Sequence, residues 1–266
     1  MRQFDVFVFD ENYDEALRKN PQPPFTDEEL GWFFTNDWNK HIDEIEGEWV
    51  VFAHPSIKID REFLNNLADV TDSFPMVDAF APRIRVEVHT ASDGSARTSE
   101  KRFLGGYLLK HASKGSGFTA IDENAPLRYV AAPHPYLAVF SRRIIQRTGR
   151  FDTTLPPIAR LADFTLRMMH AGGKMFSVPY LVAQATNDEP KQAIGFGTDT
   201  GTAADLKATA LVLSKAFGVE ASLPFAFHHP SVIPALLANR KERKAKRAAA
   251  TQLSKLKAEF LKEVTL

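Results

Sequence analysis

Residues 49–53 read WVVFA, a continuous apolar run that ends abruptly at residues 54–56 (HPS). Short apolar runs bounded in this way are typical of strands buried on both faces of a sheet. An apolar and aromatic run at residues 4–9 (FDVFVF) ends in the same manner, at Asp10. Because ligands bind at the carboxyl ends of parallel strands, the two runs predict strands whose following residues lie at a site.

Helix and strand patterns alternate along residues 1–238. Residues 61–70 place apolar side chains on one face at helical spacing, and residues 163–170 have the pattern of another helix. We expect a further helical stretch over residues 39–45 and a strand over residues 137–140. This alternation favours one α/β domain with a mixed, mostly parallel sheet that helices cover on both faces.

The composition is that of an ordinary globular protein, with 44% hydrophobic and 25% charged residues among 266. Lys and Arg together number 33, as do Asp and Glu, so the net charge gives no reason to expect a nucleic-acid partner. The absence of cysteine excludes disulfides, thiolate metal ligands and thiol nucleophiles, and it suits a reducing compartment. We find no signal-peptide pattern and no apolar run of membrane-spanning length, so we expect a cytoplasmic protein, at most bound at the inner face of the membrane.

Residues 239–266 differ from the rest of the chain in charge. They hold nine basic and three acidic residues, and apolar side chains fall at helical spacing at Leu253, Leu256, Phe260 and Val264. We therefore expect a basic amphipathic helix that follows the domain. Two interpretations stay open: the helix docks on an anionic membrane surface, or it packs on the domain or on a second copy of the chain, which is the commoner role of such a stripe.

Three stretches carry a resemblance to a known enzyme family. Residues 137–152 (LAVFSRRIIQRTGRFD) and 163–179 (DFTLRMMHAGGKMFSVP) give a strand, an Arg, a helix and Gly-x-Phe-Asp, then Asp-x-x-x-Arg, Ala-Gly and Val-Pro. Residues 39–52 (NKHIDEIEGEWVVF) give an Asn-led helix, Gly-Glu-aromatic and an apolar strand. With these three stretches the chain resembles the nucleotide-sugar glycosyltransferases of family 2, in a divergent or truncated form.

The resemblance implies a GT-A-like fold and the transfer of a sugar from a nucleotide-activated donor to a glycan, lipid or protein acceptor, as in polysaccharide biosynthesis. It implies that Asp10 contacts the base or ribose of the donor, although helix capping is an equally good interpretation of this residue. It also implies that the family's first strand and helix are missing before Asp10. The residues that we expect to bind the donor are Asp10, Asn39, His54, Ser56, His134 and Arg167.

The family's Asp-x-Asp motif is replaced in this chain. In family 2 the motif follows the strand equivalent to residues 49–53 and holds a divalent cation on the donor diphosphate, whereas this sequence has His54, Pro55 and Ser56. One imidazole and one hydroxyl are poor ligands for Mg²⁺ or Mn²⁺, so we name no metal ligands and hold a divalent cofactor doubtful. We expect His54 to meet the diphosphate instead, as a cation or hydrogen-bond donor, with His134 as a second such group. An ordinary surface histidine is the alternative for each, and it is the commoner role of a single histidine.

The acidic pair that contains the family's general base is altered as well, to Arg160 and Leu161. Asp163 is the nearby carboxylate able to remove the proton of the acceptor hydroxyl, so we name it as the candidate catalytic residue. Asp163 and Arg167 also lie four residues apart on one helix face, and an ion pair between them is an equal alternative. Catalysis requires that His54 and Asp163 open into a shared cleft.

Two functions therefore stay open. The first is an active glycosyltransferase, which the resemblance favours. The second is a catalytically degenerate protein of the same fold that acts as a saccharide-binding, nucleotide-binding or assembly module, which the altered carboxylates favour. The balance leans towards the enzyme. An unrelated α/β binding protein is a third interpretation.

Overall fold

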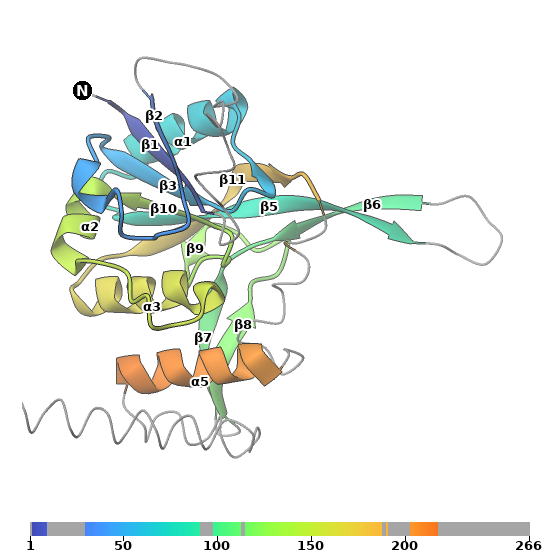
Figure 1. The fold of residues 1–266 in the computed structure, drawn as a ribbon. Coiled ribbons are helices and arrows are strands. Elements are labelled where there is room, and N and C mark those ends of the chain that lie inside the picture. The colour runs from blue at the N-terminus through green and yellow to red at the C-terminus, as the bar shows by residue number, and fades with distance from the viewer. Residues whose placement is uncertain are drawn as a thin grey trace, which may run out of the picture.

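The computed structural model describes residues 2–9, 30–90, 98–112, 115–187, 190 and 203–217 (Figure 1). Asp10 and residues 239–266 lie outside this part of the chain, so the donor contact of Asp10 and the two interpretations of the tail stay predictions. Among the described helices, none is long and apolar enough to cross a membrane.

A nine-stranded sheet forms the centre of the described structure. Its main path runs in the order β2 (Leu30–Thr35), β1 (Phe4–Phe9), β3 (Trp49–Ala53), β10 (Leu137–Ser141), β5 (Ala79–Thr90), β11 (Met175–Ala185) and β4 (Ile57–Lys58). Two further strands pair at its margin, namely β6 (Thr98–Leu104) with β5 and β9 (Arg128–Tyr129) with β11. A separate hairpin consists of β7 (Tyr107–Ala112) and β8 (Gly115–Ala120).

Strand direction agrees with the sequence-based expectation. β1 is parallel to both β2 and β3, and β5 is parallel to β11, whereas β10 runs antiparallel to β3 and β5. The prediction of a mixed, mostly parallel sheet is therefore confirmed. Because β1 and β3 are parallel neighbours in register, their carboxyl ends lie side by side at one edge of the sheet.

Helices flank both faces of the sheet (Figure 1). α1 (Arg61–Ser73) packs on one face, α2 (Arg142–Thr148) and α3 (Pro157–His170) pack on the other, and α5 (Ala203–Phe217) lies along the outer side of α3. α1 begins where the sequence predicts, because the side chain of Asp60 accepts a hydrogen bond from the Phe63 amide at 3.0 Å. α3 begins at Pro157 rather than at the predicted residue 163, and a proline suits the first turn of a helix.

The helix expected over residues 39–45 is wrong, since only the 3₁₀ turn η1 (Ile42–Glu44) forms there. The side chain of Asn39 is engaged with a distant segment instead of continuing a helix. Its amide group donates to the Phe151 carbonyl at 3.0 Å, and its oxygen accepts from the Phe151 amide at 2.9 Å. These two bonds tie the approach to β3 to the loop between α2 and α3.

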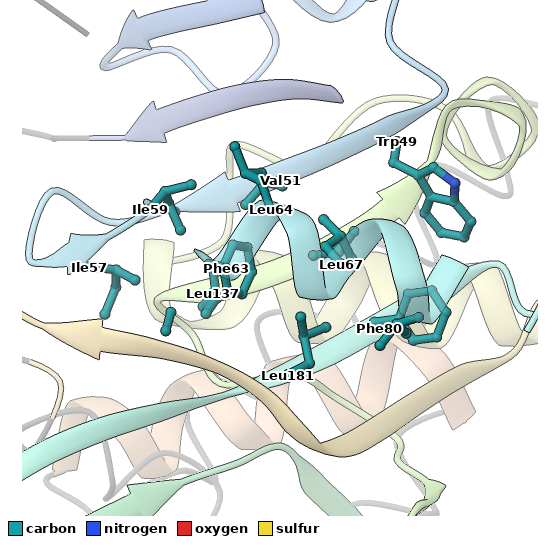
Figure 2. Close-up of a cluster of buried hydrophobic side chains, with 14 of the residues drawn as sticks. Trp49, Val51, Ile57, Ile59, Phe63, Leu64, Leu67, Phe80, Leu137 and Leu181 are labelled. Carbon is teal, nitrogen blue, oxygen red and sulfur yellow. The ribbon is translucent and has the colours of Figure 1, made fainter. Parts of the chain in front are cut away.

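The predicted burial of residues 49–53 is confirmed, because all five side chains of β3 are buried. Alternate residues of a strand point to opposite faces, so β3 contributes to two cores. Val51 packs with Phe63 and Leu67 of α1 (Figure 2). Phe52 packs on the other face, with side chains of α2 and α3.

Gly47 is placed where no side chain fits. The carboxylate of Asp5, buried in β1, accepts the amide of Glu46 at 2.8 Å and that of Gly47 at 2.7 Å. A Cβ at position 47 would lie 2.7 Å from the Asp5 nitrogen and 2.8 Å from the Phe4 carbonyl carbon. Since backbone atoms must move to relieve this contact, Gly47→Ala is expected to lower the free energy of unfolding by about 2 kcal/mol, measured by urea denaturation. Gly149→Ala, where a Cβ meets no atom within 4 Å but φ is +87°, is the comparison and costs about 1 kcal/mol.

Candidate functional site

A pocket opens at the edge of the sheet where β1 and β3 end, and we name it the His-Pro pocket. Its volume is about 390 Å³, part of which is open to solvent. The described residues that line it are Phe9, Trp38, Phe52, Ala53, His54, Pro135, Tyr136, Pro157, Ile158 and Leu161. Its location is the one that the ends of residues 4–9 and 49–53 predict, and its lining is mostly apolar.

Stacked aromatic rings form one wall of the His-Pro pocket. Phe9 and Trp38 stack with ring centroids 4.1 Å apart and planes inclined by 10°. Phe52 lies behind them, 5.5 Å from Phe9 and 5.0 Å from the ring of Phe151. Large flat side chains in close contact make a wall that changes little in shape, and such walls suit planar ligands.

Two turns of the same construction form the polar side of the pocket. In residues 54–57 the carbonyl of His54 accepts the amide of Ile57 at 2.9 Å, and in residues 134–137 the carbonyl of His134 accepts the amide of Leu137 at 3.1 Å. Each turn has proline in its second position, where the fixed φ of proline favours a turn. The His54 amide donates to the carbonyl of Tyr136 at 2.9 Å, which joins the two turns.

His54 and Ser56, both predicted to bind the donor, contact each other within the first turn. Nδ1 of His54 lies 2.7 Å from the hydroxyl of Ser56 and accepts the Ser56 amide at 3.2 Å. The imidazole is stacked on Tyr136, with centroids 4.2 Å apart and planes inclined by 16°. His54 lines the pocket, whereas Ser56 is 2% exposed and reaches the pocket only through His54.

His134 lies close to His54 but is buried, with 1% of its surface exposed. Burial lowers the pKa of His134 to about 3; the backbone of Pro190 acts in the opposite direction, and the charge of His54 adds to the lowering. His134 is therefore neutral at physiological pH. Because His134 is not among the residues lining the pocket, it supports the turn of Tyr136 rather than facing a ligand there.

Arg167 and Asn39 make contacts within the scaffold. Nε of Arg167 donates to Oδ2 of Asp163 at 2.9 Å, so the predicted ion pair along the helix is confirmed. The other two guanidinium nitrogens of Arg167 donate to the carbonyls of Thr148 at 3.1 Å and Arg150 at 3.0 Å. Arg167 thereby fixes the end of α2 and the loop that Asn39 also holds.

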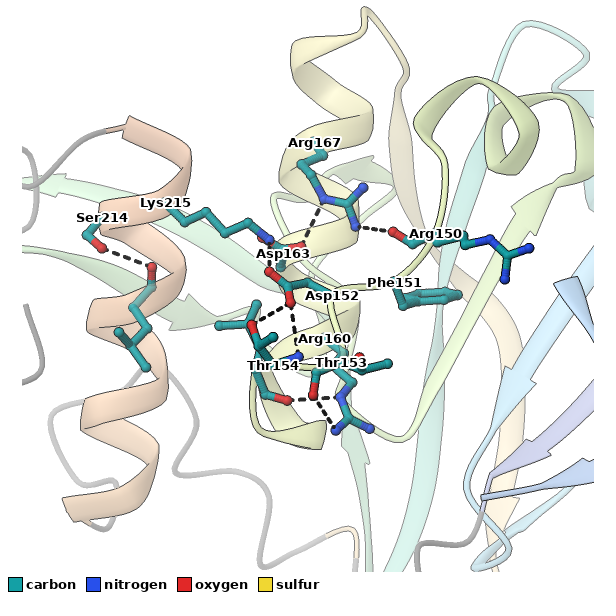
Figure 3. Close-up of polar contacts among 12 residues, drawn as sticks. Arg150, Phe151, Asp152, Thr153, Thr154, Arg160, Asp163, Arg167, Ser214 and Lys215 are labelled. Carbon is teal, nitrogen blue, oxygen red and sulfur yellow. Dashed lines mark hydrogen bonds and ion pairs between the residues drawn. The ribbon is translucent and has the colours of Figure 1, made fainter. Parts of the chain in front are cut away.

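Asp163 faces α5 and is held by two cations (Figure 3). Its carboxylate is 2% exposed, with Oδ2 on Arg167 and Oδ1 at 2.8 Å from Nζ of Lys215. The same ammonium group lies 2.6 Å from Asp152, so it joins two carboxylates. Leu161 lines the pocket, and a residue two positions away lies about 200° around the helix. Among the described residues the expected cleft shared by His54 and Asp163 is not found.

The ion pair of Asp152 gives the stability a dependence on acid. Burial raises the pKa of Asp152, but hydrogen bonds from Lys215 and Thr154 outweigh it and lower that pKa from 3.8 to about 2. A carboxyl group whose pKa is lower in the folded state contributes stability above its unfolded pKa, and this contribution is lost as the pH falls towards the folded pKa. We expect a loss of about 1 to 2 kcal/mol between about pH 4 and pH 2, allowing for partial solvent screening. The free energy of unfolding, measured at a series of pH values across this range, should change less with pH in Lys215→Met than in the wild type. An equal pH dependence in the two proteins would contradict the assignment of the lowered pKa of Asp152 to its pair with Lys215.

The residues in place of the Asp-x-Asp motif do not fit a divalent cation. Nδ1 of His54 accepts a backbone amide, so its lone pair is directed at a hydrogen and not at a metal. Mg²⁺ and Mn²⁺ prefer several oxygen ligands, while the Ser56 hydroxyl is buried against the same imidazole. Within the described residues no group of three His, Asp or Glu side chains is placed to hold a metal.

Comparisons with known proteins find similarity in structure only. No family model matches the sequence, and no curated protein matches it. The structure is similar to that of the mannosyltransferase PcManGT from Pyrobaculum calidifontis, solved with GDP-Man and Mn²⁺, with a TM-score of 0.46 and 14% identity over 96% of this chain and 80% of the other. It is also similar to residues 1–349 of TarS from S. aureus, solved with UDP-GlcNAc, with a TM-score of 0.43 and 14% identity over 85% of this chain and 71% of the other. For GalNAc-T7, solved with UDP, GalNAc and Mn²⁺, the TM-score is 0.41 and the identity 10% over 80% of this chain and 48% of the other. Overlap at this level leaves the function to be inferred from this chain's own residues.

The sequence analysis did not identify Lys215 or Tyr136 as residues of the site. Lys215 comes from α5, far from Asp152 and Asp163 in the chain, and no local pattern indicates that it reaches them. The place of Tyr136 in the site could have been predicted, because the dipeptide His-Pro occurs at residues 54–55 and again at 134–135, just outside two apolar strands. Two equal dipeptides beside neighbouring strands favour a pair of matching turns.

Proposed function

We propose that this chain is a glycosyltransferase-like protein that binds a nucleotide-activated sugar in the His-Pro pocket. The observation that supports this most directly is the position of the pocket at the carboxyl ends of β1 and β3, with His54 in its wall. Ligands of α/β sheets bind at such edges. The sequence resemblance to family 2 supports the same class of ligand.

The chemistry of the pocket suits such a donor. Trp38 and Tyr136 both line the pocket, so the exposed parts of their rings give a base or the apolar face of a sugar an aromatic surface to contact. His54, at the polar side, meets the phosphoryl oxygens. In this proposal Asn39, Ser56, His134 and Arg167 act through the scaffold, each by the hydrogen bonds described above.

A specific observation favours a second candidate, a binding module without transferase activity. In a transfer, the bond from the sugar to the diphosphate breaks, the acceptor oxygen bonds to the sugar, and the proton of the acceptor hydroxyl must be taken up. Asp163 is the candidate base, yet both of its carboxylate oxygens are bound to cations. Use of Asp163 as a base requires that Lys215 moves away, whereas ligand binding in the pocket does not.

Calorimetric titration with uridine, guanosine and thymidine diphosphate sugars tests the proposal. We expect one of them to bind, and we expect Tyr136→Ala to weaken this binding about tenfold, because stacking on an aromatic side chain contributes about 1 to 3 kcal/mol. Tyr180→Ala is the matched control, since Tyr180 is 56% exposed and does not line the pocket. Binding that is equal in both variants would place the ligand elsewhere. Release or transfer of the sugar by the wild type would favour the enzyme over the binding module.

A further inference from the structure

Four apolar side chains gather around the turn of residues 74–77, beside the start of β11. In this turn the Phe74 carbonyl accepts the amide of Val77 at 3.0 Å, so Met76 lies at the apex and is 79% exposed. On the neighbouring strands Tyr129 of β9, which is 56% exposed, contacts Phe176 of β11 with ring centroids 4.2 Å apart. The rings of Phe74 and Phe176 are 6.1 Å apart, which joins the turn to the strands. We name Phe74, Met76, Tyr129 and Phe176 the Met76 patch.

Folding alone does not account for the apolar residue at the apex of this turn. Met76 has the largest exposed fraction among the large hydrophobic residues that the structure describes. The central positions of a turn favour Asn, Asp, Ser, Gly and Pro, and a methionine there adds nothing to the turn itself. Apolar side chains that are exposed singly are ordinary, whereas several in one place mark an interaction surface.

The register of the strands places the Met76 patch at the end of the sheet opposite the His-Pro pocket. Ala53 lines the pocket and pairs with the first residue of β10. Phe140, near the far end of β10, pairs with Ala79, and Ala79 pairs with Met175. The patch flanks Ala79 and Met175 in the chain. A partner that covers the patch therefore approaches from the side away from the pocket.

Basic side chains surround the patch. Lys174 and Arg128 are exposed next to Phe176 and Tyr129 in the chain. The Lys174 amide donates to Asp78 at 3.2 Å, and the Arg143 guanidinium, on a side chain that is 70% exposed, lies 2.7 Å from the same carboxylate. Asp78 itself is 7% exposed, so the cations face outward. An apolar centre with basic neighbours fits an anionic membrane surface, which apolar side chains enter and which attracts Lys and Arg.

We infer that the Met76 patch is a docking surface for an anionic lipid bilayer, with Met76 and Tyr129 in the interface and Lys174, Arg128 and Arg143 at the lipid headgroups. A long, flexible methionine at the apex of a turn suits a fluid surface, whereas a stable protein interface needs a larger, closely packed area. Tyrosine suits the boundary because its ring is apolar and its hydroxyl polar. The inference does not depend on the ligand of the His-Pro pocket.

Co-sedimentation of the full chain with vesicles tests the inference. We expect binding to vesicles of phosphatidylglycerol and phosphatidylcholine and much weaker binding to phosphatidylcholine alone. Met76→Asp should weaken binding about tenfold, because it removes the inserted group and adds a repelled charge, and Lys174→Ala should weaken it about fivefold. Asp72, exposed in the last turn of α1, opposes the attraction, so Asp72→Asn should strengthen binding. A wild type that binds neither vesicle or both equally overturns the inference, and so does unchanged binding by Met76→Asp.

Tyr129 and Tyr180 form a matched pair of variants, because each is 56% exposed. Tyr180 follows Phe176 by four residues, about 13 Å at the rise of a β-strand. Tyr129→Asp should weaken vesicle binding and Tyr180→Asp should not, with circular dichroism to check that both fold; equal losses overturn the inference. Sedimentation velocity without lipid tests a second copy of the chain as the partner. A dimer that Met76→Asp dissociates would overturn the assignment to a bilayer.

Discussion

Asp163→Asn is expected to lower the free energy of unfolding by about 3 kcal/mol, because it removes the shared partner of two cations at a buried position. The carboxylate is 2% exposed and binds Arg167 and Lys215 at 2.9 and 2.8 Å. Asparagine keeps the shape of the side chain, so the decrease in the free energy of unfolding measures the contribution of the Asp163 charge. We place the value at the low end of the range for buried pairs because Lys215 keeps Asp152 as a partner. Urea denaturation at pH 7 measures it.

A double-mutant cycle separates this role from catalysis. If Asp163 and Lys215 interact as the structure has them, Asp163→Asn and Lys215→Met together should cost about 1 kcal/mol less than the sum of the single changes. A candidate base that served only catalysis would instead lose turnover with no change in stability. Full additivity of the two substitutions would contradict the ion pair between α3 and α5.

Phe52→Ala is expected to have the largest effect on stability, a loss of about 4 kcal/mol. Phe52 is 1% exposed, and its ring contacts those of Phe9, Trp38 and Phe151 behind the His-Pro pocket. Removing it leaves a cavity that the neighbouring rings cannot fill without shifting, so nucleotide-sugar binding should weaken in parallel. Thermal unfolding followed by circular dichroism measures the first effect and calorimetry the second.

Phe217→Ala is the control for the loss of an aromatic ring at the surface. Phe217 is 43% exposed at the end of α5, so its removal should cost less than about 1 kcal/mol. A Phe52→Ala variant that is as stable as Phe217→Ala would contradict the close packing behind the pocket.

The strands and the edge of the sheet were predictable because the relevant signals are local. The uninterrupted apolar run of residues 49–53 indicates a strand buried on both faces, and its end marks the site. The helix over residues 39–45 was predicted wrongly because the bonds of Asn39 to Phe151 are long-range. The sequence pattern within residues 39–45 cannot predict a hydrogen-bond partner that lies more than a hundred positions away in the chain.

Asp163 shows the same limit at the level of the site. Spacing along a helix correctly predicted its pair with Arg167. The residue that decides its environment is Lys215, which reaches it from α5. The direction of Asp163 around α3, away from the pocket that Leu161 lines, also depends on how the helix packs on the sheet. Local sequence specifies neither.

A crystal structure of the chain with the nucleotide sugar that binds most tightly tests the central claim most directly. We predict that the donor lies in the His-Pro pocket, with a ring against Tyr136 and a phosphoryl oxygen within hydrogen-bond distance of the imidazole of His54. A donor bound at another surface, with the pocket between Trp38 and Tyr136 empty, would contradict the account.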